Sequence, residues 1–338
     1  MIFYDFEEMK YMKSVNLAVV GATGVVGRKI LDILEKRNFK INELYLFSSA
    51  KSAGKKVKFR DKEYTVSELC EDSFDNNIDI ALFSAGGSTS LKYAEIAAKK
   101  GVRVVDNSSA WRMAPNVPLV IPEVNPNAIK EDNMIIANPN CSTIQSVIAI
   151  KPIYDKYGIK RIIYNTYQAV SGAGIKGIED LKNNTTNKFK YSISLNCIPQ
   201  IDVFLDNGYT KEEMKMVNET RKILENDNIK ITATAVRVPI ENSHAVSINL
   251  ETEKNFNDNE LFDVIKNGKD IILMDDTENE VYPLETVAND KDEVFVGRVR
   301  RDFSIENGIN MWCVADNIRK GAATNAVQIA ELLVERYF

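Results

Sequence analysis

Three glycines spaced three residues apart, Gly21, Gly24 and Gly27, constrain the fold of this chain most strongly. They follow a short apolar segment, residues 15–20, and open a run whose apolar residues lie on one helical face, residues 25–34. Glycine lets a backbone turn tightly and approach a pyrophosphate, whose charge a helix N-terminus stabilises. The context is that of a dinucleotide-binding loop, although the spacing is not GxGxxG and a purely structural turn remains an alternative.

The first 140 residues alternate between short apolar strands and helices, a pattern typical of a doubly wound parallel sheet. Further strands are expected at 44–47, 78–84 and 102–105, with a helix at 88–100. The second half carries longer alternating segments with few helices between them, which predicts an α+β domain with a mostly antiparallel sheet. These segments are residues 161–167, 229–238, 245–251 and 295–300.

The fold class is therefore α/β, a Rossmann-like domain joined to an α+β domain. We place the first domain at residues 12–139 together with a returning C-terminal helix, 320–338, and the second at 140–319. Residues 1–11 are expected to form a disordered N-terminal extension, and the Lys- and Asn-rich segment 182–190 a solvated loop.

Composition narrows the function classes. A formal net charge of −5 argues against nucleic acid as a partner. No apolar run approaches the roughly 20 residues that span a bilayer, so no membrane partner is expected. The four cysteines lie far apart without a CxxC pair, which argues against a metal site or disulfides and favours the cytoplasm. They are Cys70, Cys141, Cys197 and Cys313.

Two residues suggest covalent catalysis. Cys141 stands at the predicted start of an apolar helix, where the helix dipole favours the nucleophilic thiolate, although it could also be a small buried hydrophobe. His244 is the only histidine and the only imidazole available as an acid or base near neutral pH, although a lone histidine is often structural. The loop at residues 168–174 follows a strand and is expected to approach a ligand, unless it is a plain glycine-rich hairpin.

The segment after the second strand, residues 48–54, indicates which cofactor the loop would take. An NAD site usually places a carboxylate here to hold the ribose 2′-hydroxyl. This chain instead offers Lys51 between the hydroxyls of Ser49 and Ser52, which favours the 2′-phosphate of NADP, although an ordinary polar turn would look the same.

Many stretches of the chain, from about Val15 to the C-terminus, resemble the aspartate-semialdehyde dehydrogenase family. They are residues 21–27, 49–54, 85–86, 106–108, 122–125, 138–145, 168–174, 199–202, 219–224, 237–244, 297–300, 316–317 and 320–323. The resemblance implies a homodimer or homotetramer whose second domain carries catalysis and dimerisation.

The resemblance also implies roles for individual residues. The catalytic residues would be the nucleophile Cys141, the acid/base His244 and Gln168, which helps to position the reacting carbon. The substrate-binding residues would be Arg237 and Glu219 at the amino-acid end, Arg112 and Lys222 at the phosphate, and Asn140 and Gln168. Without the resemblance, Glu219 and Lys222 would be interpreted as an exposed helical ion pair. The cofactor-binding residues would be Gly21, Thr23, Gly24, Val25, Val26, Ser49, Lys51, Ser52, Ser84, Ala85, Gly86, Ser171, Gly172 and Asn317.

The implied reaction is the NADPH-dependent reductive dephosphorylation of 4-phospho-L-aspartate to L-aspartate 4-semialdehyde and phosphate, through a cysteine thioester. It would serve lysine (diaminopimelate), methionine and threonine biosynthesis. The alternative is N-acetyl-γ-glutamyl-phosphate reductase, which shares fold and chemistry but takes an acylated amino group. Two departures from the family stand out: the segment 178–196 is short, and Lys51 replaces a common arginine.

Overall fold

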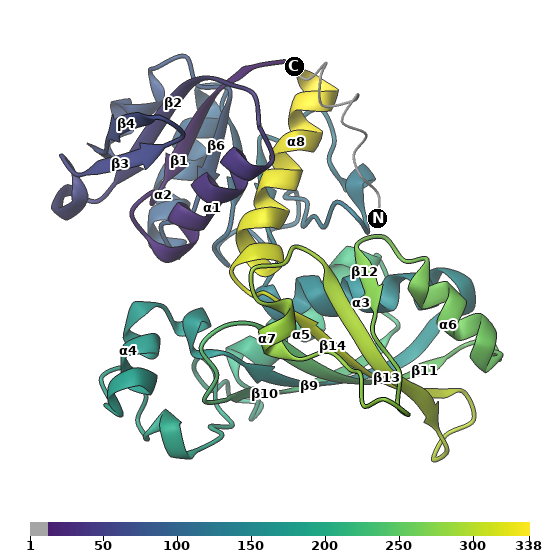
Figure 1. Ribbon diagram of the computed structural model, residues 1–338. Coiled ribbons are helices and arrows are strands. Elements are labelled where there is room, and N and C mark those ends of the chain that lie inside the picture. The colour runs from purple at the N-terminus through teal and green to yellow at the C-terminus, as the bar shows by residue number, and fades with distance from the viewer. Residues whose placement is uncertain (1–12) are drawn as a thin grey trace. The chain divides into compact units, whose positions relative to one another are not determined.

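Figure 1 shows a computed structural model of the chain, which describes residues 13–338. The chain divides into two compact units, each with its own sheet. The first unit contains residues 13–139 and Ala322–Phe338, and the second contains Asn140–Gly321. The predicted disordered extension, 1–11, lies outside the described residues. No helix between residues 13 and 338 combines the length and apolar character needed to cross a membrane.

The first unit is built on a six-stranded parallel sheet in the order β5-β2-β1-β6-β7-β8. When these six strands are renumbered from 1 to 6 in chain order, the sheet has the 3-2-1-4-5-6 strand order of dinucleotide-binding sheets. The strand order reverses between β1 and β6, which is the topological switch point. Their bounds are β1 Val15–Val20, β2 Ile41–Ser48, β5 Ser67–Glu68, β6 Ile80–Phe83, β7 Arg103–Asp106 and β8 Ile135–Ala137. A small hairpin accompanies them, β3 Lys56–Phe59 and β4 Lys62–Thr65.

Helices cover both faces of this sheet. α1 (Val25–Lys36) and α8 (Asn325–Tyr337) share one apolar cluster with the sheet, whereas α2 (Gly87–Lys99) belongs to a second cluster. Arg37 donates two hydrogen bonds to Glu331, at 2.7 Å each, and so links the end of α1 to α8. The last helix of the chain therefore completes the core of the first unit.

The second unit contains a six-stranded mixed sheet in the order β10-β9-β11-β14-β13-β12. The central pairs are antiparallel, whereas β10 runs parallel to β9 and β12 parallel to β13. The bounds are β9 Ile159–Gln168, β10 Lys230–Arg237, β11 His244–Thr252, β12 Ile271–Leu273, β13 Val294–Asp302 and β14 Gly308–Ala315. Both parts of the predicted fold class, a parallel doubly wound sheet and a mostly antiparallel one, are confirmed.

The expectation of few helices in the second half was wrong. The unit contains α3 Cys141–Tyr157, α4 Ile175–Asn183, α5 Lys211–Leu224, α6 Asp258–Lys266 and α7 Glu285–Ala288. Figure 1 shows α3, α5 and α6 on one side of the sheet. The sequence indicates α5 only at the Glu219–Lys222 pair, because three buried residues of this helix, Glu212, Glu213 and Glu219, are carboxylates and obscure the apolar period.

The segment 182–190 is only partly the loop that the sequence predicts, because Lys182 and Asn183 belong to α4. The buried carboxylate of Asp180 organises the turn after this helix, accepting hydrogen bonds from Thr185 and from the backbone N–H groups of residues 187–189. Short helical turns complete the chain at Ala50–Ser52, Glu71–Phe74, Pro126–Ala128, Val170–Ala173 and Ile193–Leu195, with a π-helix at Arg319–Thr324.

Candidate active site

The predicted cofactor loop lies at the carboxyl end of β1, beside the end of β6. Gly21 has a φ of +86°, and a Cβ atom there would stand 2.4 Å from the carbonyl oxygen of Ser84. A Cβ on Gly27 would stand 2.2 Å from the carbonyl oxygen of Gly21. Gly24 is the N-cap of α1, and no side chain among the described residues caps that helix. Tight packing and an open helix N-terminus therefore coincide at the switch point, where an anionic ligand is favoured.

Hydroxyl groups connect this loop to the end of β2. The Thr23 hydroxyl lies 2.9 Å from that of Ser48 and donates to the Ser52 hydroxyl at 3.3 Å. Ser49 and Lys51 are exposed on the same short turn. The remaining predicted cofactor residues of the first unit follow β1 or β6, namely Val25, Val26, Ser84, Ala85 and Gly86.

Arg112, the predicted phosphate ligand, also belongs to the first unit, unlike the other predicted substrate residues. Its buried guanidinium donates from Nε to the carbonyl oxygen of Asn138 and from Nη2 to that of Asn107, at 2.9 Å each. Two main-chain carbonyls thus fix its orientation.

Cys141 is the first residue of α3, as the predicted helix start requires, and is half-buried. Asn140 caps this helix: its Oδ1 accepts the backbone N–H groups of Ser142 at 3.0 Å and Thr143 at 3.3 Å. A Cβ on Gly321 would stand 2.8 Å from the Cβ of Cys141. The thiol therefore experiences the positive end of the α3 dipole and is packed against a position that tolerates only glycine.

We expect Gly321→Ala to lower turnover by about 10²-fold, because a displacement of roughly 1 Å of a reacting group can cost that much. The added methyl would push Cys141 aside. Steady-state kinetics together with the rate of Cys141 alkylation by iodoacetamide would measure the effect, with thermal melting to verify the fold. Wild-type values for both rates would contradict this packing argument.

A buried carboxylate that sequence analysis missed, Glu212, lies at the centre of the second unit's polar cluster. It accepts hydrogen bonds from the side-chain amides of Asn140 at 2.9 Å and Gln168 at 3.2 Å. It also pairs with Lys215 at 3.0 Å and interacts electrostatically with Arg237. Burial alone would raise the pKa of Glu212, but Lys215 and the two amides outweigh it and lower the pKa. Glu212 is therefore held as a carboxylate.

The predicted substrate residue Arg237 donates from Nη1 to the carbonyl oxygen of Ala169 at 2.6 Å. Its Nε is buried, and the described residues provide no hydrogen-bond partner for it. A buried guanidinium N–H without a partner is costly, and a carboxylate ligand would satisfy it.

Glu219 and Lys222 lie two turns further along α5 and are placed differently from Glu212 and Lys215. The Glu219 carboxylate accepts the backbone N–H of Asn140 at 2.7 Å, a contact that holds the start of α3. Burial lowers the pKa of Lys222, and the charge of Glu219 partly opposes this. Glu219 thus has a structural hydrogen bond, and the polar cluster is organised by Glu212.

His244 is buried at the start of β11, and its Nδ1 accepts the backbone N–H of Ala169 at 3.0 Å. Burial, reinforced by the charge of Arg237, lowers the pKa of His244 to about 3. The imidazole is thus neutral in the resting protein. The preceding residue, Ser243, has a φ of +70°, and its N–H donates to Oδ1 of Asn317 at 2.9 Å.

The other predicted cofactor residues in the second unit surround His244. Asn317 Nδ2 donates to the Ser171 hydroxyl at 3.0 Å. A Cβ on Gly172 would stand 3.4 Å from Nε2 of His244. Gln145, which sequence analysis assigned no role, donates from Nε2 to the carbonyl oxygen of His244 at 3.0 Å. Because Gln145 lies one turn after Cys141 in α3, this hydrogen bond links α3, which carries the thiol, to β11, which carries the imidazole.

A dinucleotide-type sheet and a separate unit with a thiol at a helix start define a class of protein: dehydrogenases that bind their substrate through a cysteine. Known families agree with that class. The protein-family model for the semialdehyde dehydrogenase NAD binding domain matches residues 16–132. The family model for the semialdehyde dehydrogenase dimerisation domain matches residues 150–320.

Individual relatives narrow the class. The aspartate-semialdehyde dehydrogenase of Aquifex aeolicus is 57% identical over 333 residues, 95% of this chain and 98% of that protein. The crystal structure of aspartate semialdehyde dehydrogenase II from Vibrio cholerae has a TM-score of 0.92 at 48% identity and covers 96% of this chain and 100% of its own. A second structure of that enzyme, complexed with ASA, gives the same values. The chain belongs to the aspartate-semialdehyde dehydrogenase family, which confirms the resemblance.

Proposed function

We propose that this chain catalyses the NADPH-dependent conversion of 4-phospho-L-aspartate to L-aspartate 4-semialdehyde and phosphate. The observation that carries the proposal is the half-buried Cys141 at the N-terminus of α3, in the same unit as a cluster of Gln168, Glu212, Arg237 and His244. The first unit binds the nucleotide, and the second performs the chemistry. The product supplies the synthesis of lysine, methionine and threonine in the cytoplasm.

The thiolate of Cys141 attacks the acyl carbon, and the C–O bond to phosphate breaks to leave a thioester. When bound, NADPH supplies the hydride that reduces this thioester. We assign to Gln168 the positioning of the reacting carbon that the resemblance implies; its Nε2 donates to Glu212 at 3.2 Å, which fixes the orientation of its amide. The electrostatic interaction of Arg237 with Cys141 favours the thiolate that begins the reaction.

The substrate's amino-acid end is charged, and the second unit contains matching groups. Arg237 offers its buried Nε to the α-carboxylate. Glu212, ionised and already in contact with two amides, is suited to the α-ammonium group. We therefore assign to Glu212 the role that the sequence suggested for Glu219, whose carboxylate supports the backbone of Asn140.

Lys215 is the corresponding candidate for the phosphate end, in place of Lys222. Burial would lower the pKa of Lys215, but Glu212 and Asp202 raise it overall, so its ammonium stays charged. Arg112 remains a second phosphate candidate, since main-chain carbonyls orient its guanidinium.

The Michaelis constant for phosphate, measured in Lys215→Ala and in Lys222→Ala, compares the two lysines. We expect the larger increase in Lys215→Ala, and a larger increase of this constant in Lys222→Ala would overturn the assignment.

The cofactor residues fit NADP. The α1 N-terminus is open for the pyrophosphate, and residues 48–54 offer hydroxyls and Lys51 without a carboxylate.

Lys51→Glu is expected to narrow or reverse the preference for NADP over NAD, because it places a negative charge against the 2′-phosphate. Comparing kcat/KM for the two cofactors measures this, and Lys40→Glu, exposed at the opposite end of β2, is the control. Equal use of both cofactors by the wild-type enzyme would refute the assignment.

The competing activity, reduction of N-acetyl-γ-glutamyl phosphate, is not favoured. An acylated nitrogen carries no charge, so it could not make the charge-assisted contact that an α-ammonium group would make with the ionised Glu212. One experiment tests the proposal: phosphate-dependent reduction of NADP with L-aspartate 4-semialdehyde, run beside N-acetylglutamate semialdehyde. Turnover of only the acetylated substrate would contradict it.

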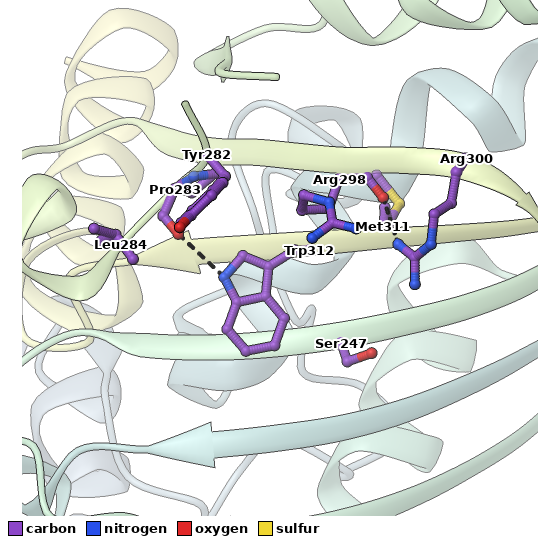
Figure 2. Close-up of a pocket in the computed structure, with 8 residues that line it drawn as sticks. All are labelled: Ser247, Tyr282, Pro283, Leu284, Arg298, Arg300, Met311 and Trp312. Carbon is purple, nitrogen blue, oxygen red and sulfur yellow. Dashed lines mark hydrogen bonds between the residues drawn. The ribbon is translucent and has the colours of Figure 1, made fainter. Parts of the chain in front are cut away.

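We also propose a homodimer built on the open face of the second unit's sheet. Figure 2 shows a pocket on this face, where the Trp312 indole N–H donates to the carbonyl oxygen of Pro283 at 3.2 Å. Aromatic, methionine and arginine side chains line it, as is typical of interfaces. The lining residues are Ser247, Tyr282, Pro283, Leu284, Arg298, Arg300, Met311 and Trp312.

A charge on this face is expected to dissociate the dimer. Leu284 is 45% exposed, so Leu284→Glu should leave the subunit folded while opposing burial against a second copy. Leu91→Glu, at a 56% exposed position of α2, is the matched control. Light scattering after size exclusion should give a monomer for the first variant alone; two unchanged dimers would exclude this interface.

A further inference from the structure

The loop at Val170–Ala173 borders the polar cluster of the second unit. In the proposed reaction, hydride is delivered to a thioester on Cys141, so residues of the second unit must contact the hydride-bearing end of NADPH. Gly172 of this loop is exposed, and a Cβ there would stand 3.1 Å from Nη1 of Arg237 and 3.4 Å from Nε2 of His244. A glycine at that point leaves the backbone open to a ligand, so the loop fits this end of the cofactor.

Main-chain hydrogen bonds attach one side of the loop to the chain before β11. The Val170 N–H donates to the carbonyl oxygen of Ile240 at 2.8 Å, and the Ser171 N–H donates to that of Glu241 at 3.0 Å. The Ser171 hydroxyl accepts a hydrogen bond from Asn317 Nδ2 at 3.0 Å. The rest of the loop depends for support on α4, the helix that follows it.

α4 packs on the loop through a glycine, Gly177. A Cβ on Gly177 would stand 2.6 Å from the carbonyl oxygen of Val170 and 2.9 Å from the Cβ of Ala173. Neither atom is the end of a flexible side chain, so any larger residue at this position would displace the loop or the helix. A glycine inside a helix lowers its stability relative to alanine, and close contact with the loop is the structural reason for one here.

The turn after α4 returns to the same contact. The Phe189 ring would stand 3.4 Å from the Cβ of a residue larger than Gly177. Asp180, one turn further along α4, fixes this turn: its carboxylate accepts the Thr185 hydroxyl and the backbone N–H groups of residues 187–189, at 2.7 to 3.1 Å. Burial would raise the pKa of Asp180, but these hydrogen bonds outweigh it and lower the pKa to about 2.

We propose that α4 sets the position of the loop at Val170–Ala173 against the cofactor, with Gly177 and Asp180 as positioning residues. The inference deepens the proposed function and rests on the assignment of Ser171 and Gly172 to NADPH. Gly177 seats the helix on the backbone of the loop, and Asp180 holds the turn that packs against the same glycine. Both residues act through the loop and not on the reacting atoms.

Gly177→Ala distinguishes this packing from an ordinary helix position. In a helix with free space around the residue, alanine would raise the melting temperature and leave the cofactor site unchanged. Here the added methyl displaces Ser171 and Gly172, so we expect the dissociation constant for NADPH to rise about five- to tenfold, the scale of one lost hydrogen bond. The Michaelis constant for phosphate at saturating NADP should stay near the wild-type value, because its candidate ligand Lys215 lies on α5.

Asp180→Asn should raise the same dissociation constant, because an amide has only one acceptor oxygen for the donors of the turn. Glu179→Ala, at the exposed neighbouring position of α4, is the matched control and should bind NADPH as the wild type does. Titration of NADPH fluorescence measures binding without turnover, and circular dichroism with thermal melting verifies the fold of each variant. Should Gly177→Ala fail to fold, the result for Asp180→Asn decides.

Wild-type NADPH affinity in folded Gly177→Ala or folded Asp180→Asn would overturn the inference, as would an equal loss of affinity in Glu179→Ala. A wild-type enzyme that does not bind NADPH would instead contradict the proposed function. The two failures are therefore distinguishable in one set of titrations.

Discussion

Replacing Cys141 with serine is expected to preserve the fold and to lower kcat by at least roughly 10⁴-fold, the scale of losing a catalytic nucleophile. The reason is chemical. A hydroxyl at the start of α3 ionises far less readily than a thiol and is therefore a much poorer nucleophile. Steady-state assays in both directions measure the loss, and circular dichroism verifies the fold.

The matched control for this variant is Cys197→Ser, because Cys197 is an exposed thiol of the same unit. It should behave as wild type. Turnover near the wild-type rate in folded Cys141→Ser would rule out a covalent mechanism at this position.

Neutralising Glu212 is expected to raise the Michaelis constant for aspartate semialdehyde about ten- to a hundredfold, the equivalent of losing one charge-assisted contact of about 1.5–3 kcal/mol. Glu212→Gln keeps the size of the side chain but removes the charge that would face the substrate's ammonium group. It would also weaken the pairing with Lys215.

The same substitution two turns along α5, Glu219→Gln, is the matched comparison. Its carboxylate accepts the Asn140 N–H, so the variant should lower the melting temperature while changing the Michaelis constant far less. Thermal melting and initial-rate kinetics on both variants separate the two roles. A larger kinetic effect at Glu219 would restore the assignment that the sequence suggested.

Much of the fold can be predicted from local sequence patterns. The strand Val15–Val20 is apolar throughout because it is buried on both faces, and the glycines after it are demanded by backbone contacts as short as 2.2 Å. The edges of the second sheet were harder to predict. The three-residue strand Ile271–Leu273 is too short for a period, and the parallel pairing of β10 with β9 depends on tertiary contacts.

The candidate site likewise contains some residues that the sequence indicates and others that only the structure reveals. The positions of Cys141 and His244 could be predicted because a helix start and a single histidine are visible in the sequence. Glu212 could not, because α5 contains Glu-x-x-Lys twice, and only packing shows that the Glu212 carboxylate is the one that accepts the side-chain amides of Asn140 and Gln168. One signal was available: Glu212 and Glu219 lie seven residues apart, which places both on the same helical face.

The most direct test of the central claim is to trap the thioester. Enzyme incubated with aspartate semialdehyde and NADP, in the absence of phosphate, should release about one NADPH per subunit and then stall, because the acyl group has no acceptor. Mass spectrometry of the digested protein should find the aspartyl adduct on the peptide containing Cys141. An adduct on Cys70, Cys197 or Cys313 instead, or steady turnover with every cysteine unmodified, would contradict the account.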